Sequence, residues 1–449
     1  MTHDPRLDGF LDDLLRGRLS RREVFRRGAA LGIAAPALAS VVTLSPALTR
    51  AVGAQDKGKL KLASNQSDPV PRKRVEQLVA DFQTSSGVQV ELNTSDHEAF
   101  KQQIRQFLAS GDPPDVLTWF AGNRMRFFVD KKLVLPITDV FEKQGWGTAY
   151  PEGILAVSKG SDGQYYFAPT QYYWWAIYYR PSLFQKAGIE APPATFDELL
   201  AAVDKLNEAE IKPFTIGTLA PWPAAGWFDY LNMRTNGPEF HVELTDGKAA
   251  YNSPEVKETF ANWRKLLDKK AFIEQPEALK WEDAITPMYK GQAAMYLMGK
   301  FITDSYPDDG EKDLDFFRFP KINDVKIGED APTDGYFMAA KAKNVDAGKQ
   351  FLAYVGSKDV QQKQAQSANG PLAIHKDVPL DIYPAPTQKG IKLLQESDYI
   401  AQFYDRDTTP EMAEKGMSAF QQFMANPGDV DQILDALDEE RKRIFAADQ

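Results

Sequence analysis

Hydrophobic positions along residues 59–119 recur with two alternating periods. Strands are predicted where apolar residues occupy every second position, and helices where they fall at i, i+3, i+4 and i+7. Val75, Leu78, Val79 and Phe82 show the helical spacing within one segment. The predicted order is strand, helix, strand, helix, strand, at residues 59–63, 72–85, 88–92, 100–108 and 116–119. This alternation predicts a doubly wound α/β lobe.

Three polar loops follow the predicted strands, at residues 64–68, 93–98 and 119–124. They carry Asn, Gln, Asp, His, Glu and Trp side chains. In doubly wound folds ligands bind outside the carboxyl ends of the strands, so these loops are candidate ligand loops. For any single residue, ordinary loop polarity is an equally good explanation.

A second unit begins near Gln171, and its helices carry start signals. Thr195 and Glu198 are predicted to form a capping box, in which each side chain accepts a hydrogen bond from the other's backbone. Ser253 and Pro254 begin another helix. The later predicted elements are a strand and two helices, at residues 336–340, 410–425 and 430–445. A chain of this length is expected to form two or three domains.

Residues 1–54 are predicted to be an export leader. Residues 20–25, SRREVF, resemble the twin-arginine motif, and residues 28–49 carry no charge. Small residues lead up to Ala54, so cleavage is expected after it. The alternative is an uncleaved membrane anchor, which the length of the uncharged run allows. Two prolines within that run count against an anchor.

Without the leader, residues 55–449 form an acidic chain. Of 53 basic and 63 acidic residues, 8 and 5 lie in the leader, which leaves 45 and 58 and a formal net charge of −13. Such a chain is unsuited to nucleic acid. The sequence contains no cysteine, which excludes disulfides, thiolate zinc sites and a lipid anchor on cysteine. The only expected membrane contact is through the leader or a membrane partner.

No motif for catalysis or cofactor binding occurs in the sequence. The phosphate loop, GxGxxG, HExxH and GxSxG are missing. The four histidines have no ligand spacing; they are His3, His97, His241 and His375. A glycosidase needs two carboxylates that flank a sugar bond, and nothing specifically indicates such a pair. We therefore expect no catalytic residue, metal site or cofactor.

Several short motifs follow one another in a set order. They are PDVLTW at 114–119, DGQYYFAP at 162–169, YRPSLFQKAGI at 179–189, PATFDEL at 193–199 and YKGQAAM at 289–295. Together they resemble the carbohydrate class of extracellular solute-binding proteins, the group that contains maltose-binding proteins. Arg180 and Phe196 depart from the Asn and Trp that are common in the family.

The resemblance implies an α/β fold of two lobes, the type II periplasmic-binding-protein fold, with several crossovers and the ligand in the cleft. The first lobe would comprise residues 55–170 and a return segment at 334–375. The second would comprise residues 171–333, and the helices of 376–449 would pack on it. The implied ligand-binding residues are Asn65, Gln66, Glu98, Trp119, Asn123, Tyr172, Tyr173, Trp174, Trp227, Asp229, Trp281, Lys300, Phe301, Asp334, Gly335 and Tyr336.

The implied function is that of the substrate-binding component of an ABC importer. It would bind a sugar or oligosaccharide outside the cytoplasm and deliver it to the permease, as a monomer and without chemistry. Clustered aromatic residues suit the C–H faces of sugar rings, although most are expected in the core. The alternatives are the same fold with a polyamine or another solute, a secreted carbohydrate-active enzyme, and a receptor that feeds a sensor.

Overall fold

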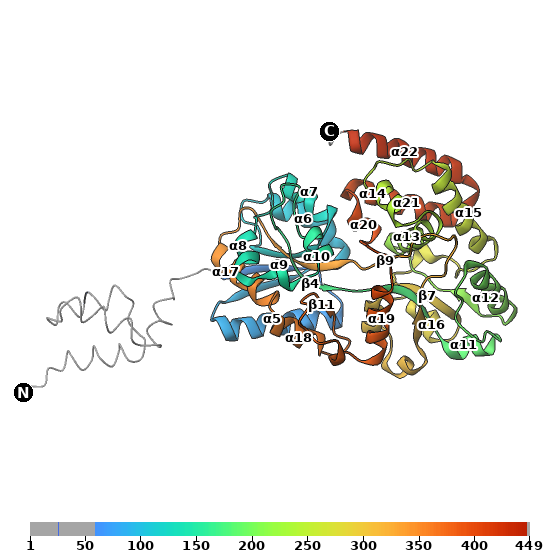
Figure 1. Cartoon of the computed structure of the whole chain (residues 1–449), viewed down its shortest axis with the longest axis horizontal. Coiled ribbons are helices and arrows are strands. Elements are labelled where there is room, and N and C mark those ends of the chain that lie inside the picture. The colour runs from blue at the N-terminus through green and yellow to red at the C-terminus, as the bar shows by residue number, and fades with distance from the viewer. Residues whose placement is uncertain (1–25, 27–58, 447–449) are drawn as a thin grey trace, which may run out of the picture. The chain divides into compact units, whose positions relative to one another are not determined.

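The computed structural model describes Arg26 and residues 59–446. Apart from Arg26, the predicted twin-arginine leader, residues 1–54, lies outside the described residues. Residues from Leu60 onward form two α/β lobes (Figure 1). Within the described part of the chain, no helix has the length and apolar content needed to cross a bilayer.

A six-stranded sheet with the order β11-β4-β10-β3-β1-β2 forms the first lobe. Strands β1, β2 and β3 are parallel, whereas β10, β4 and β11 add antiparallel pairs. The strands are β1 (Leu60–Ser64), β2 (Val90–Thr94), β3 (Val116–Phe120), β4 (Ala168–Tyr172), β10 (Thr333–Met338) and β11 (Leu372–Ala373). The predicted alternation of strands and helices is therefore confirmed for the part of the sheet that residues 60–120 supply.

Helices cover both faces of this sheet. Val116 and Met338 pack in a cluster with α5 and α17, whereas their neighbours Leu117 and Phe337 pack with α6 and α7. Successive strand residues point to opposite faces, so α5 and α6 lie on opposite sides of the sheet. The helices are α5 (Pro69–Ser86), α6 (His97–Ala109), α7 (Asn123–Asp130), α8 (Thr138–Gln144), α9 (Trp146–Ala149), α10 (Glu152–Val157), α17 (Val345–Val355) and α18 (Lys358–Ala365).

The second lobe contains a four-stranded sheet with the order β6-β7-β5-β8. Its central strand β7 is buried at every position, as expected for a strand covered on both faces. The strands are β5 (Trp175–Tyr179), β6 (Lys212–Phe214), β7 (Ala293–Gly299) and β8 (Asp315–Phe317). The helices are α11 (Pro181–Lys186), α12 (Phe196–Glu208), α13 (Trp222–Asn236), α14 (Pro238–Thr245), α15 (Pro254–Asp268) and α16 (Ile285–Tyr289), with 3₁₀ segments η1 (Pro276–Ala278), η2 (Lys300–Asp304) and η3 (Asp308–Asp313).

The chain passes between the two sheets more than once. It leaves the first sheet after β4 and enters the second at β5, and it returns from β9 (Gly328–Asp330) to β10. A parallel pair of β9 with β12 (Tyr399–Ala401) lies beside this return. The connections place short polar segments between the lobes, where they can contribute to a shared site.

The last helices pack mainly on the second lobe. Phe420 of α21 stacks on Phe228 of α13 at 4.1 Å, and Phe423 meets Phe260 of α15 at 4.6 Å. One segment differs, because α20 contacts α7 of the first lobe. The remaining elements are η4 (Leu380–Ile382), α19 (Ala385–Gln395), α20 (Tyr404–Asp407), α21 (Pro410–Ala425), η5 (Pro427–Asp429) and α22 (Val430–Ala446).

Local sequence signals account for several boundaries. The predicted capping box of Thr195 and Glu198 is confirmed at the start of α12. Ser253 caps α15, as its side chain accepts from the backbone N–H of Val256. Helix α5 begins at Pro69, three residues before the predicted start, because proline is tolerated in the first helical turn where its missing N–H is not needed.

Candidate functional site

A cavity of about 490 Å³ lies between the two lobes. The loops after β1 and β2 line it, together with Phe120 at the end of β3. The carboxyl ends of these parallel strands therefore meet at the cavity, as expected for this sheet type. The volume falls within the range of about 300–1,000 Å³ that is typical of small-molecule sites.

Five aromatic residues of the second lobe line the cavity, and we call them the aromatic wall. They are Trp175, Trp222, Trp281, Phe301 and Phe403. The ring centroid of Trp222 lies 6.0 Å from Trp175, 6.1 Å from Trp281 and 6.1 Å from Phe301. Such a wall offers apolar area that can pack against C–H groups of a ligand.

The packing of the aromatic wall requires a glycine in α13. A Cβ atom at Gly226 would lie 2.8 Å from the ring of Trp175. Trp175 in turn stacks on Phe403 with centroids 4.6 Å apart and an interplanar angle of 21°. The rings of Trp175 and Phe403 therefore stack on each other and pack against α13 at Gly226, where the helix has no side chain.

Arg406 connects the C-terminal segment to the first lobe. Its Nη1 donates to Asp334 Oδ1 at 2.6 Å, and its Nη2 donates to Tyr173 Oη at 2.8 Å. The guanidinium lies 4.1 Å from the ring centroid of Phe120. Burial raises the pKa of Asp334, and the charge of Arg406 opposes that shift.

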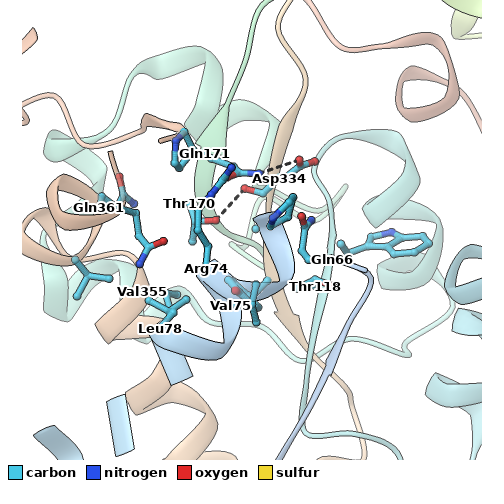
Figure 2. A pocket seen from close by; sticks show the side chains of 17 residues that line it. Gln66, Arg74, Val75, Leu78, Thr118, Thr170, Gln171, Asp334, Val355 and Gln361 are labelled. Atoms are coloured by element: carbon cyan, nitrogen blue, oxygen red, sulfur yellow. Dashed lines mark hydrogen bonds between the residues drawn. The ribbon is translucent and has the colours of Figure 1, made fainter. Parts of the chain in front are cut away.

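Two residues of β4 complete the surroundings of Asp334. Gln171 Nε2 donates to Asp334 Oδ2 at 3.3 Å, and Thr170 Oγ1 donates to the Asp334 carbonyl at 3.4 Å. Figure 2 shows both side chains directed toward Asp334. The carboxylate therefore has partners from the connection and from the C-terminal segment together.

Asp405 is a second buried carboxylate at the cavity. Arg124 Nη1 donates to its Oδ2 at 3.1 Å, and Lys101 Nζ lies 3.9 Å from the same oxygen. Burial alone would raise the pKa of Asp405, but the neighbouring cations, Arg124 first, lower it below its usual range. The carboxylate is therefore held ionised by positive charge on the first lobe.

A further set of polar contacts involves η2. Arg74 of α5 forms an ion pair with Asp304, whose side chain is 8% exposed. Lys300 Nζ donates to the Asn369 carbonyl at 2.9 Å, and Asn369 Nδ2 donates to the Thr303 carbonyl at 3.0 Å. Burial lowers the pKa of Lys300 to about 8, against the opposing charge of Asp304.

Eight of the residues implied by the family resemblance line this cavity. They are Gln66, Glu98, Tyr172, Tyr173, Trp281, Lys300, Phe301 and Asp334. They come from loops that are far apart in the sequence. The fold therefore brings together half of the predicted site.

Three other predicted residues line a smaller chamber of about 70 Å³ in the first lobe, namely Trp119, Gly335 and Tyr336 (Figure 2). The chamber shares Gln66 and Asp334 with the main cavity. Gly335 has a packing reason of its own, because a Cβ atom there would lie 2.1 Å from the Ala168 carbonyl oxygen.

The prediction for Trp174 is corrected by the geometry of the connection. Trp174 is buried against Phe316, with centroids 5.4 Å apart, and does not line the cavity. Tyr173 and Trp175, its two neighbours, do line it. Successive residues in an extended chain face opposite ways, so Trp174 points away from the cavity that Tyr173 and Trp175 line.

The predictions for Trp227 and Asp229 are corrected by their position on α13. Trp227 is fully buried, 4.8 Å from Phe214 between ring centroids. Asp229 is also fully buried, and its Oδ2 accepts from the Tyr404 backbone N–H at 2.9 Å. Trp227 lies about 140° around the helix from Trp222 and points into the core. Asp229 lies on nearly the same side as Trp222 but about two turns farther along, where it contacts Tyr404.

Asn65 and Asn123 also lie away from the cavity lining. Asn65 is buried, and its Oδ1 accepts from Thr118 Oγ1 at 2.9 Å. Asn123 Nδ2 donates to the Asp407 carbonyl at 2.7 Å. Asn65 therefore joins the ends of β1 and β3 through Thr118, and Asn123 contacts the C-terminal segment across the two lobes.

The prediction missed much of the aromatic wall and the charged network. Trp175 and Trp222 stood out in the sequence as aromatic, but no motif marked which of the clustered rings face the cavity. Phe403, Asp405 and Arg406 contact Trp175, Arg124 and Asp334, which lie 228, 281 and 72 residues away in the sequence. Nothing in the local sequence around them predicts those contacts.

Two α/β lobes around a shared cavity define a class of two-lobed binding proteins, and comparison with known proteins gives the family. Residues 68–362, more than half of the chain, match the family described as bacterial extracellular solute-binding protein. The chain therefore belongs to that family.

Known relatives and a solved structure agree with this family. An uncharacterised ABC transporter extracellular-binding protein of Pyrococcus horikoshii is 26% identical over 66% of this chain and 66% of its own length. A "Probable sugar-binding periplasmic protein" of Mesorhizobium japonicum is 24% identical over 67% of this chain and 72% of its own. The bacterial solute receptor AcbH is 31% identical with a TM-score of 0.82, over 87% of this chain and all of that one.

Proposed function

We propose that this protein binds a neutral sugar in the cavity between its lobes and delivers it to the membrane subunits of an ABC importer. The aromatic wall is the observation that carries the proposal. Five clustered rings on one side of a polar cavity suit a ligand with apolar C–H faces and many hydroxyl groups. In this account the protein binds its ligand without chemistry.

The charges of the cavity favour a neutral ligand over a polyamine. Three carboxylates of its lining, Asp304, Asp334 and Asp405, have side chains only 8%, 13% and 7% exposed. Each forms an ion pair with an arginine of the chain itself. A polyamine would have to compete with a guanidinium that is already in place, and breaking a buried pair is costly.

Relatives with named ligands support the same class of solute. AcbH is described as having an exclusive preference for β-D-galactopyranose. The Mesorhizobium relative is named as sugar-binding and periplasmic. Because these proteins are named as receptors or binding proteins, they also favour binding over catalysis.

The export route is part of the proposal. The twin-arginine motif at Arg21 and Arg22 would direct the protein out of the cytoplasm, to the periplasm or the cell surface. Replacing both arginines with lysine should leave the protein in the cytoplasm. Fractionation of cells that express the variant tests this, and unchanged export would contradict the route.

A thermal-shift screen of the purified chain tests the ligand class. The panel contains neutral mono- and oligosaccharides, amino acids and polyamines. A ligand at about 100 times its dissociation constant adds roughly 2.7 kcal/mol to the free energy of unfolding and raises the melting temperature. A shift with a neutral sugar and no release of reducing ends supports the proposal. A shift with polyamines alone, or turnover of the sugar, contradicts it.

A further inference from the structure

The two lobes are bridged on both sides of the first sheet, and both bridges line the cavity. One bridge starts from α5 and the other involves α7, and these helices cover opposite faces of the sheet. The cavity lies at the carboxyl ends of the parallel strands of the same sheet. Its two flanks are therefore each crossed by side-chain contacts between the lobes.

The first bridge joins α5 and the return segment to η2. It consists of the ion pair of Arg74 with Asp304 and the reciprocal contacts of Asn369 with Lys300 and Thr303. The side chains of Arg74 and Asp304 are only 16% and 8% exposed. Both residues of the ion pair also line the cavity, so a ligand that extended past this flank would meet them.

The second bridge joins α6 and α7 to the C-terminal segment. Arg124 Nη1 donates to the carbonyl of Asp405 at 2.8 Å as well as to its side chain, and Asn123 Nδ2 donates to the carbonyl of Asp407. Lys101 reaches the Asp405 carboxylate from the cavity side. The side chains of Asp405 and Arg124 are 7% and 10% exposed, so this flank also carries a buried ion pair between the lobes.

A sugar chain that runs along an open cleft must leave it at one or both ends. Here each bridge carries an ion pair between the lobes, Arg74 with Asp304 on one flank and Arg124 with Asp405 on the other, and a sugar chain that passed there would have to separate those charges. The cavity between the bridges has a volume of about 490 Å³, which lies within the range of small-molecule sites.

We infer that the two bridges set the length of the ligand, so that the protein encloses a mono- or disaccharide and excludes longer chains. This inference rests on the proposed sugar-binding function. It assigns Arg74 and Asp304 as residues that select for ligand length. They act by blocking the flank of the cavity where a longer chain would continue.

The test uses isothermal titration of the full exported chain with a series of one sugar type, from the monosaccharide to the hexasaccharide. The mono- or disaccharide should bind at least about 100-fold more tightly than the tetra- and hexasaccharide. Equal or tighter binding of the longer chains overturns the length limit but leaves the proposed function intact. Failure of every sugar to bind overturns the proposed function itself.

A double variant, Arg74→Ala with Asp304→Ala, tests the assigned pair. Both charges are removed together, so neither is left buried without a partner. The preference for short over long chains should fall by about tenfold or more. An unchanged preference in a variant with a normal melting temperature would overturn the assignment of the pair.

The matched control is Arg72→Ala with Glu76→Ala. This ion pair lies on the same helix α5, but its side chains are 56% and 49% exposed and neither lines the cavity. The control variant should keep the length preference of the parent. If both double variants lose the preference for short chains, the effect comes from the general stability of α5. That result would contradict the assignment of Arg74 and Asp304.

Discussion

The two walls of the cavity are built from different chemistry. The second lobe supplies the aromatic wall together with charged residues such as Lys300 and Asp304, whereas the first lobe supplies mainly polar and charged side chains from the loops after β1 and β2. Rings provide apolar contact area without strong direction, and hydrogen-bonding groups provide direction with a small net energy for each bond. A ligand gains both only when the lobes close on it, which makes closure a population shift that the ligand drives.

The largest expected effect is a loss of stability when an aromatic residue of the core, behind the aromatic wall, is replaced. Trp227 is fully buried on α13, so Trp227→Ala should lower the free energy of unfolding by about 3–5 kcal/mol. Urea unfolding measures this loss. If the variant keeps its stability but loses the ligand, Trp227 belongs to the site and the division between wall and core is wrong.

Arg406 joins the C-terminal segment to the first lobe, and replacing it should also lower the free energy of unfolding strongly. Arg406→Ala would leave Asp334 and Asp405 buried with fewer cations, at a cost of about 3–5 kcal/mol in unfolding free energy. Urea unfolding of the variant is the measurement. As a control, Arg264→Ala removes a partner of the exposed Asp268 and should cost less than about 1 kcal/mol. Equal losses in the two variants would contradict the role given to Arg406.

Trp222 tests the aromatic wall itself. Trp222→Ala should weaken sugar binding by about 2 kcal/mol, or roughly 30-fold, because a central ring of the wall is removed. Isothermal titration measures the change, and Trp222→Phe should recover part of it. Unaltered affinity in the alanine variant would mean that the ligand rests elsewhere.

Gln66 tests the polar wall with a smaller effect. Gln66→Ala should weaken binding by about 0.5–1.5 kcal/mol, the net value of one hydrogen bond. Gln77→Ala, an exposed residue of α5, is the matched control. If Gln66→Ala exceeds Trp222→Ala in effect, the polar wall and not the aromatic wall dominates the affinity.

The free energy of unfolding should depend on pH through the side chain of Asp407 in the C-terminal segment. Burial, followed by the charge of Asp246, raises the pKa of Asp407 to about 7. The unfolded chain releases this proton near pH 3.9. The stabilising contribution is therefore complete below about pH 4 and is lost as the pH rises through about 7. Between about pH 5 and about pH 8, the free energy of unfolding of Asp407→Asn, measured with urea, should fall less than that of the parent. An equal fall in the two proteins would contradict this.

The elements of the first lobe could be predicted from periodicity, since strands and helices of residues 60–120 follow period-2 and period-3.6 patterns. Half of the residues that the family resemblance implied lie in the cavity lining. They failed at Trp174 because a motif doesn't show which face of an extended segment meets the ligand. They failed at Arg406 because its contacts with Asp334 and Tyr173 depend on how distant segments fold together.

A crystal structure of the protein with the sugar selected by the thermal-shift screen tests the central claim most directly. The account predicts a sugar between the two bridges, with an apolar ring face against the aromatic wall and hydroxyl groups toward the first lobe. A sugar bound outside this cavity, or one whose ring faces touch none of the five aromatic residues, would contradict it.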